Sequence, residues 1–189
     1  MSHSELANVV LETERLILRA PRLDDAPLIG AYLNNLNVTR HLLRPPYPYH
    51  VSDARTYLLA AIEGRSTGYW FPCAIERKQD GLFIGTMGLS LTPEFKRGEL
   101  GYWLGEPFWN RGYTSEALTP LIDFGFKYFD LIRIQANHFT DNPASGRVMQ
   151  KAGMTYEGTL RHYFVRFDQT KDAAFYGILR EEWQQLSNP

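Results

Sequence analysis

The stretch Glu99–Ala117 (ELGYWLGEPFWNRGYTSEA) has the residue types and the order of an anion-binding site. An apolar, aromatic segment, Leu100–Leu104, is followed by a turn-rich connector, and an amphipathic pattern begins at Ser115. The first backbone N–H groups of a helix have no partner inside the helix, and the helix dipole adds partial positive charge there. Gly112 lets the backbone approach a ligand closely, and Arg111 adds a full positive charge. We therefore expect a phosphate-bearing ligand at the start of this helix.

Other kinds of chemistry have little support in the sequence. A glycine before a helix is also common in a plain turn, and the signature G-x-x-x-x-G-K followed by Ser or Thr is absent, so ATP is not expected. The five His are scattered and no H-E-x-x-H motif occurs, so no metal site is expected. Cys73 lies in the apolar run Trp70–Ile75 and is expected to be a buried side chain rather than a nucleophile.

The first half of the chain must supply elements that support this segment. We expect a strand over Val9–Arg19, a helix over Asp24–Leu36 and a second helix over 52–63. Arg44–Tyr49 (RPPYPY) contains three prolines and is expected to be an extended loop.

Three strands are expected next, over Tyr69–Glu76, Leu82–Leu91 and Gly98–Leu104, as an antiparallel meander with a hairpin turn at Asp80-Gly81. The remaining pattern predicts a helix over 115–129, a strand over 132–138, a short helix from Asn142-Pro143 to Gly153, and closing strands over 155–164 and 173–179. One strand–helix–strand crossover then lies in an otherwise antiparallel arrangement, which indicates an α+β, or mixed α/β, fold.

Composition limits the classes of partner. The 189 residues include 44% hydrophobic residues and carry a net charge of -1, so no broad electrostatic field attracts nucleic acid. The polar segment Met1–Ala7 lacks a signal-peptide core, and no apolar run has the length of a membrane helix. We expect a cytoplasmic protein without direct nucleic-acid or membrane binding.

Several short motifs occur together in an order that resembles the GNAT superfamily of acetyl-CoA-dependent N-acetyltransferases, and most closely its Rim-type ribosomal-protein N-terminal acetyltransferases. The resemblance covers nearly the whole chain. The matching motifs are Thr13-Glu14-Arg15-Leu16, Ile84-Gly85-Thr86, Glu99–Leu104, Arg111–Ala117, Asn142-Pro143-Ala144-Ser145, and Lys151–Met154 with Glu157-Gly158.

The resemblance implies one acetyltransferase domain over residues 1–189, with a central, mostly antiparallel sheet of about seven strands and about four flanking helices. The sheet splays between its fourth and fifth strands, and the pantetheine arm of coenzyme A lies in that gap. The backbone of Trp103 and Leu104, in the fourth strand, is expected to pair with the arm.

The resemblance also assigns a pyrophosphate-binding role to the backbone N–H groups of the loop before the long helix. The residues of this loop are Asn110, Arg111, Gly112, Tyr113, Thr114 and Ser115. Thr114 departs from the family pattern, which has Gly or Ala at that place, and its side chain either bonds or crowds the phosphates. Trp109 also differs from the usual Gln or Arg, although Rim-type members commonly have Trp there.

Two residues of the short helix 143–151 and its start are candidates by the same resemblance. Ser145 is the candidate general acid for the thiolate leaving group and also contacts the cofactor. The Tyr that many members use instead falls at Met149 here. Asn142 is a candidate cofactor ligand, although a helix cap is the plain alternative.

The attacking amine must lose a proton, and a carboxylate can accept it. Glu99 is our first candidate for this base. Glu116, His138 and His162 remain alternatives; Glu116 could simply complement the helix dipole.

The acceptor is expected to be a primary amine, either the N-terminal α-amine of a ribosomal or other protein or a small molecule such as a polyamine, an amino acid or an antibiotic. Tyr47, Tyr49 and Tyr163 are expected to line its pocket. Transfer would be direct, in a ternary complex, without a metal. A non-catalytic acyl-CoA sensor on the same fold is the alternative class, and the chain could be a monomer or a homodimer.

Overall fold

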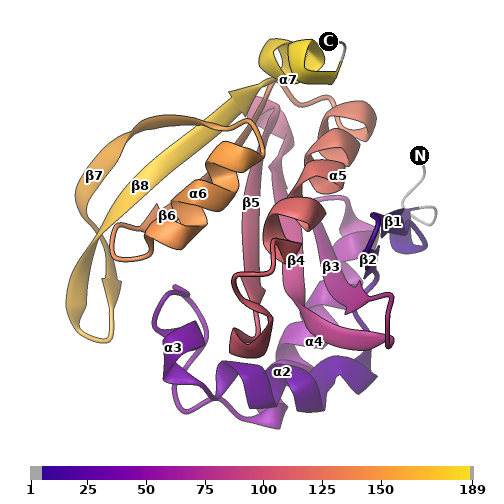
Figure 1. The fold of residues 1–189 in the computed structure, drawn as a ribbon, viewed down its shortest axis with the longest axis vertical. Coiled ribbons are helices and arrows are strands. Elements are labelled where there is room, and N and C mark those ends of the chain that lie inside the picture. The colour runs from indigo at the N-terminus through magenta and orange to yellow at the C-terminus, as the bar shows by residue number, and fades with distance from the viewer. Residues whose placement is uncertain (1–5, 188–189) are drawn as a thin grey trace.

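A computed structural model of the chain describes residues 6–187. A sheet of eight strands runs through the molecule in the order β1-β2-β3-β4-β5-β6-β8-β7 (Figure 1). All neighbouring strands in it are antiparallel except β5 and β6, which are parallel. The strands span Leu11–Glu12 (β1), Leu16–Arg19 (β2), Trp70–Arg77 (β3), Leu82–Thr92 (β4), Arg97–Leu104 (β5), Arg133–Phe139 (β6), Thr155–Arg166 (β7) and Gln169–Leu179 (β8).

Helices cover both faces of this sheet (Figure 1). On one face, Leu118 of α5 and Met149 of α6 belong to a large apolar core. On the other face, Ile29 of α2 and Leu58 of α4 belong to a second core. The helices span Ala26–Leu33 (α2), Leu36–Thr39 (α3), Val51–Thr67 (α4), Tyr113–Tyr128 (α5), Pro143–Lys151 (α6) and Arg180–Ser187 (α7). Within residues 6–187, none of the helices combines the length and the apolarity that crossing a bilayer requires.

The parallel strands β5 and β6 pair over a short distance only. Arg97, Gly98 and Glu99 of β5 face Arg133, Ile134 and Gln135 of β6, and no register continues beyond them. From Leu100 to Leu104, β5 keeps its partner β4 but has none on its other edge. The expected splay is therefore confirmed, and it begins immediately after Glu99.

The N-terminal region differs from the expectation of one strand over Val9–Arg19. The chain reverses there, so that β1 and β2 form a hairpin in which Leu11 faces Leu18. This hairpin accounts for the eighth strand. The helix expected over Asp24–Leu36 is divided into a short 3-10 turn, α2 and α3, and the C-terminal helix α7 was not expected at all. Pro120, which should loosen the long helix, lies inside a continuous α5.

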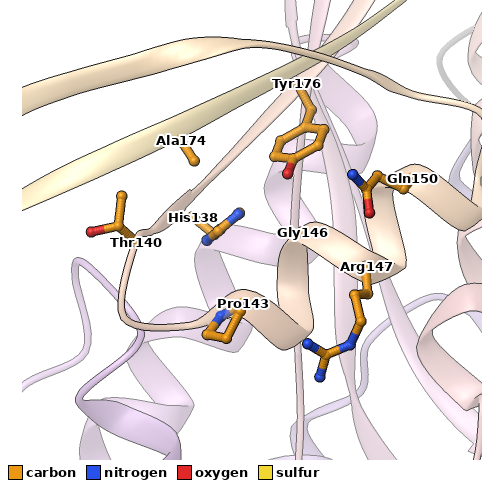
Figure 2. A pocket seen from close by; sticks show the side chains of 8 residues that line it. All are labelled: His138, Thr140, Pro143, Gly146, Arg147, Gln150, Ala174 and Tyr176. Atoms are coloured by element: carbon orange, nitrogen blue, oxygen red, sulfur yellow. The ribbon is translucent and has the colours of Figure 1, made fainter.

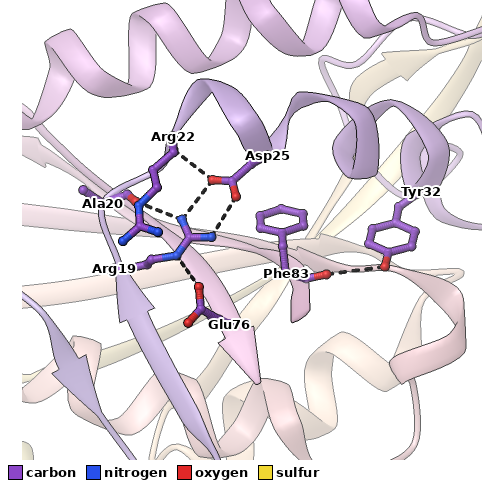
Figure 3. A network of polar contacts seen from close by, with 7 residues as sticks. All are labelled: Arg19, Ala20, Arg22, Asp25, Tyr32, Glu76 and Phe83. Carbon is purple, nitrogen blue, oxygen red and sulfur yellow. Dashed lines mark hydrogen bonds and ion pairs between the residues drawn. The ribbon is translucent and has the colours of Figure 1, made fainter. Parts of the chain in front are cut away.

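A buried ion-pair network ties the first elements to the sheet (Figure 3). The Arg19 guanidinium donates to both carboxylate oxygens of Asp25, at 3.0 and 2.7 Å, and to Glu76 Oε2 at 2.6 Å. Arg19 and Asp25 are both buried. Burial alone would lower the pKa of Arg19, but the two carboxylates raise it, so the guanidinium stays charged.

A second buried arginine holds the N-terminal segment. Arg65 of α4 donates to the carbonyls of Leu6, Val9 and Pro72 at 2.7 to 3.0 Å. Cys73 lies beside it and is fully buried, and burial raises the pKa of its thiol to about 11. The thiol therefore stays protonated at neutral pH, and the expectation of a buried, unreactive cysteine is confirmed.

Candidate functional site

The loop before α5 has a backbone suited to anion binding. Asn110 and Gly112 adopt positive φ values of 59° and 79°. The first helical hydrogen bond of α5 is the one from Glu116 N–H to Gly112 O. Within residues 6–187, no backbone N–H from Asn110 to Ser115 donates a hydrogen bond that the structure records. These free donors at a helix start fit a diphosphate.

The loop is anchored by a contact that the sequence reading missed. The carboxylate of Glu116 accepts from the Thr13 hydroxyl at 2.5 Å and from the Arg15 backbone N–H at 2.9 Å, and it pairs with the Arg15 guanidinium at 2.5 Å. Arg15 also donates to the carbonyl of Arg111 at 3.1 Å. The turn between β1 and β2 thus binds the start of α5. Glu116 is engaged in this anchor rather than free to accept a proton from an amine.

The register of β4 and β5 shows which backbone groups face the gap. Gly105 N–H donates to Ile84 O of β4 at 3.0 Å. In an antiparallel pair the bonded residues alternate, so Trp103, two residues earlier, also directs its backbone groups at β4. The backbone groups of Tyr102 and Leu104 face the gap instead. Trp103 therefore does not present its backbone to a ligand in the gap, contrary to our expectation.

The two gap-facing residues differ in what they leave free. The indole N–H of Trp109 donates to the carbonyl of Leu104 at 2.9 Å, so one of the two backbone groups of Leu104 is already bonded. Trp109 thereby ties the loop before α5 to the end of β5. The N–H groups of Tyr102 and Leu104 both face the gap.

The helix-side face of the gap carries the candidate acid. Tyr102 packs against the core that contains α5, together with its neighbours Leu100 and Leu104. Its hydroxyl lies 2.8 Å from Ser145 Oγ and 3.3 Å from the Ser145 carbonyl oxygen. Ser145 thus lies at the start of α6, across the gap from β5. Sequence reasoning named Ser145 but not Tyr102, although Tyr102 shares its face of β5 with the two buried leucines.

The opposite face of the gap carries the candidate base. The side chain of Glu99 accepts a hydrogen bond from Gln135 Nε2 at 3.0 Å and one from Asn137 Nδ2 at 3.3 Å. Both donors come from β6, so they hold the carboxylate at the point where the strands separate. Within the described residues, nothing lies within 4 Å of the position that a Cβ on Gly101 would occupy, so the face beside Glu99 is open. The two amides could have been found from their alternation with the buried Ile134 and Ala136.

This alternation places the two candidate groups on opposite faces of the sheet. A thioester in the gap would have Ser145 on its helix side and Glu99 on its open side. An amine that approaches on the open face would meet the thioester carbon with its proton directed at Glu99. Such an arrangement can serve an acyl transfer in which the sulfur leaves on one face and the nucleophile arrives on the other.

The remaining candidates are spread over the molecule. Asn142 is at the N-cap position of α6, but its side chain makes no capping hydrogen bond, so the cap that we named as the alternative is not formed. His138 lies on the helix side, stacked on Tyr176 at 5.7 Å, and not on the face of Glu99. His162 is in the exposed part of β7, where its backbone N–H donates to the side chain of Asp172.

A cavity of about 310 Å³ lies between α6 and strands β6 and β8 (Figure 2). His138 Nδ1 lies 2.8 Å from the Phe139 carbonyl oxygen, which only accepts, so Nδ1 carries the proton. Nε2 of His138 is buried without a partner among the described residues. A Cβ on Gly146 would come within 2.9 Å of both Nε2 and the Tyr176 hydroxyl, which explains a glycine at this place in α6.

The three tyrosines expected around the acceptor do not share one environment. Tyr49 is buried in the core formed by α2 and α4, and burial raises its pKa to about 12, so it does not line an open pocket. Tyr47 is 45% exposed and lies edge-on to Phe167 at the β7–β8 turn, with ring centroids 6.5 Å apart. Tyr163 of β7 is 49% exposed. Tyr47, in the loop after α3, and Tyr163, on β7, remain candidates.

Arg166 joins β7 to α3 and the loop that follows it. It lies at the end of β7 and donates to the carbonyls of Thr39, Leu43 and Pro45, which belong to α3 and the loop after it, at 3.1, 3.4 and 2.6 Å. Burial lowers the pKa of Arg166. Sequence reasoning had no signal for this residue, because its partners are all backbone carbonyls of a distant loop.

No group of three or more His, Cys, Asp or Glu side chains in residues 6–187 is placed to hold a metal ion.

Comparisons with known proteins point to one family. A model of the acetyltransferase (GNAT) domain matches residues 15–155. The uncharacterized N-acetyltransferase YoaA of Bacillus subtilis is 34% identical over 173 residues, which cover 90% of this chain and 97% of that protein. The ribosomal protein uS5-alanine N-acetyltransferase of Escherichia coli is 23% identical over 188 residues, covering 95% of each.

A solved structure shares the fold over almost the same length. The structure of RimL, a ribosomal alpha-N-protein acetyltransferase in complex with coenzyme A, matches with a TM-score of 0.83 at 22% identity. The match covers 90% of this chain and 98% of that one. At this identity the likeness shows the fold, and the residues of the site have to be judged by their own geometry.

Proposed function

Since this chain belongs to the GNAT acetyltransferase family, we propose that it transfers the acetyl group of acetyl-CoA to a primary amine by direct attack in a ternary complex. One observation carries the proposal. Glu99 and Ser145 lie on opposite faces of the gap between β5 and β6, next to a helix start with free N–H groups. A sensor of acyl-CoA would need the loop and the gap but not this pair.

The cofactor would be held by the loop and the edge of β5. Backbone N–H groups from Asn110 to Ser115 bind the diphosphate, with the Arg111 cation beside them. The pantetheine arm pairs with the gap-facing backbone of Tyr102 and Leu104. Asn142 has a free side chain at the start of α6 and contacts the cofactor there.

The chain's own groups then divide the work. Glu99 takes the proton from the amine nitrogen, directly or through a water, as that nitrogen attacks the thioester carbon. The new C–N bond forms and the C–S bond breaks, and the sulfur leaves with the bonding electrons. Ser145 donates a hydrogen bond to this thiolate, which afterwards takes a proton from solvent. The gap-facing backbone N–H group that the arm leaves free, on Tyr102 or Leu104, stabilises the oxyanion.

We infer that the acceptor is the α-amine of a protein N-terminus. The face beside Gly101 is open, and Tyr47 and Tyr163 are exposed, which suits an extended peptide. The names of the Escherichia coli relative and of RimL both describe acetylation of ribosomal proteins, which supports the same choice. An α-amine also has a pKa of about 8, which makes its neutral form accessible near pH 7.

Calorimetry with acetyl-CoA and acetyl transfer to short peptides test the proposal. We expect acetylation of peptides with a free α-amine and none of the same peptides with a blocked N-terminus and an internal lysine. Transfer to spermidine but not to peptides would contradict the choice of acceptor. Binding of acetyl-CoA without transfer to any amine would favour a sensor.

Glu99→Gln keeps the shape of the side chain and removes the base. We expect kcat to fall by about 10²–10³, while the dissociation constant for acetyl-CoA stays the same. The matched control is Glu94→Gln on the exposed turn Pro93–Phe95, which should leave both values unchanged. A Glu99→Gln protein with full activity would exclude Glu99 as the base.

A further inference from the structure

The side chain of Tyr102 links β5 to the start of α6. Its backbone belongs to the unpaired part of β5, and its hydroxyl reaches Ser145 at the start of α6, 2.8 Å from Oγ. The Tyr102 ring packs against the helix-side core. The hydroxyl is therefore fixed at the place where the thiol end of a ligand in the gap would meet α6.

The possible hydrogen bonds of this pair follow from their donors and acceptors. The Ser145 carbonyl, 3.3 Å from the Tyr102 hydroxyl, only accepts. If Tyr102 donates to this carbonyl, Ser145 is left to donate to Tyr102. If Tyr102 donates to Ser145 Oγ at 2.8 Å, the proton of Ser145 is free to point elsewhere.

The phenol keeps its proton in the pH range where an amine is acetylated. Burial raises the pKa of Tyr102 to about 12, although its hydrogen bond with Ser145 lowers it. Tyr102 is thus a lasting donor and not a base. Net transfer of its proton to a thiolate would be uphill, because thiols have a pKa of about 8.5.

We propose that Tyr102 is a positioning residue that donates to Ser145 Oγ and so directs the Ser145 proton at the departing sulfur of coenzyme A. This inference rests on the proposed function. The C–S bond breaks, the thiolate accepts the hydrogen bond of Ser145, and Tyr102 keeps its own proton throughout. A purely structural alternative is that Tyr102 only holds α6 against β5.

The thiol of bound coenzyme A reports on this arrangement without turnover. The thiolate absorbs in the ultraviolet, so its pKa can be titrated in the complex of the protein with reduced coenzyme A. We expect the wild-type protein to lower this pKa below that of free coenzyme A. Tyr102→Phe should raise the pKa of the thiol again by about one pH unit, which is a tenfold change in the equilibrium between thiol and thiolate. The kcat for acetylation should fall by about tenfold, with an unchanged dissociation constant for acetyl-CoA.

A double-mutant cycle separates positioning from structure. If Tyr102 acts through Ser145, then Tyr102→Phe should change neither the thiol pKa nor kcat further in a Ser145→Ala background. Additive effects of the two substitutions would overturn the inference. The control is Tyr156→Phe, which removes a comparable tyrosine hydroxyl bond, 2.9 Å to Thr159 on the exposed strand β7, and should change neither readout.

The outcomes distinguish the two proposals. A wild-type protein that binds no coenzyme A would refute the proposed function, and the inference with it. A wild-type protein that binds coenzyme A and lowers its thiol pKa, with no change in Tyr102→Phe, would refute the inference alone. Circular dichroism and the binding constant show whether each variant is folded.

Discussion

Two glutamates flank the loop before α5, and they have different hydrogen-bond partners. Glu99 accepts hydrogen bonds from two neutral amides and faces open space, with no cation paired to it in the described residues. Glu116 accepts from Thr13 and Arg15 and lies in an ion pair. In sequence both were candidates for the base. The two can be told apart only once the turn between β1 and β2 is seen to bind Glu116, and this turn is far from either residue along the chain.

The engagement of Glu116 predicts a dependence of stability on pH. Burial would raise its pKa, but the hydrogen bonds from Thr13 and Arg15 and the positive charge of Arg15 lower it below the ordinary value. A carboxylate with a depressed pKa in the folded state stabilises the protein at higher pH, and this contribution is lost as the pH falls through the folded pKa. We expect Glu116→Gln to reduce the free energy of unfolding by about 1–2 kcal/mol at pH 7.

The difference between the wild-type and Glu116→Gln proteins should shrink once the pH falls below about 4, near the ordinary pKa of glutamate. Urea denaturation at a series of pH values measures it. Glu94→Gln, at an exposed position, should track the wild type at every pH. A Glu116→Gln difference that stays constant into the acid range would contradict the assigned role of the carboxylate.

At the scale of elements, the loop before α5 requires a glycine for its conformation and not for space. A Cβ on Gly112 would meet only the tip of Arg15, at 3.5 Å, but φ is 79°. Gly81 in the β3–β4 turn is similar, with φ of 66° and nothing within 4 Å of its Cβ position. Alanine at either place should therefore cost about 1–2 kcal/mol of stability.

Only the substitution in the loop should affect the cofactor. We expect Gly112→Ala to raise the dissociation constant for acetyl-CoA by about tenfold, because about 1.4 kcal/mol corresponds to that factor. Gly81→Ala should leave it unchanged. Calorimetric titration compares the two at equal stability loss. Equal affinities would show that the loop conformation does not control binding.

The bond between β7 and the α3 loop predicts a separate effect on the acceptor. Arg166→Met keeps the bulk but removes three hydrogen bonds to carbonyls. We expect amide exchange of residues 39–44 to accelerate by about tenfold or more, and KM for the peptide to rise while acetyl-CoA binds as before. Arg161→Met, on the exposed part of β7, is the control. A Met variant with wild-type exchange would contradict the link.

Sequence patterns were sufficient where an element is determined by its own residues. The meander from Tyr69 to Leu104, the long helix and the crossover strand appear within a few residues of their expected bounds. The pattern failed at Val9–Arg19, because the reversal at Thr13–Arg15 is stabilised by the distant Glu116. Tyr49 was misjudged for a similar reason, since the packing of α2 and α4 buries it.

The candidate site could be located but not assembled from the sequence. The loop was found from its residue types and its place before a helix, whereas Glu99 and Ser145 were found through the family resemblance. Tyr102 and the amides of Gln135 and Asn137 were not, because their parity matters only once it is known that the pairing of β5 and β6 stops after Glu99. That stop is a property of the whole sheet.

At the scale of the whole molecule, the buried Arg19 network joins β2 and β3 to Asp25, which immediately precedes α2. Asp25→Ala would leave the guanidinium buried with only Glu76 as a charged partner. We expect a loss of about 3–5 kcal/mol in the free energy of unfolding. Asp24→Ala, at the exposed neighbouring position, is the control. Denaturant unfolding measures both, and a loss within about 0.5 kcal/mol of wild type for Asp25→Ala would contradict the role of the network.

Because β5 and β6 stop pairing after Glu99, no backbone hydrogen bonds close the sheet between its two sides there. On the proposed function, the acyl donor enters from the side of α5 and α6, and the amine enters from the other. Each substrate then binds from its own face of the sheet, and each product can leave from the face by which its precursor entered. A molecule that joined coenzyme A covalently to an acceptor peptide would have to thread this opening, which would make it a ligand that occupies both entrances at once.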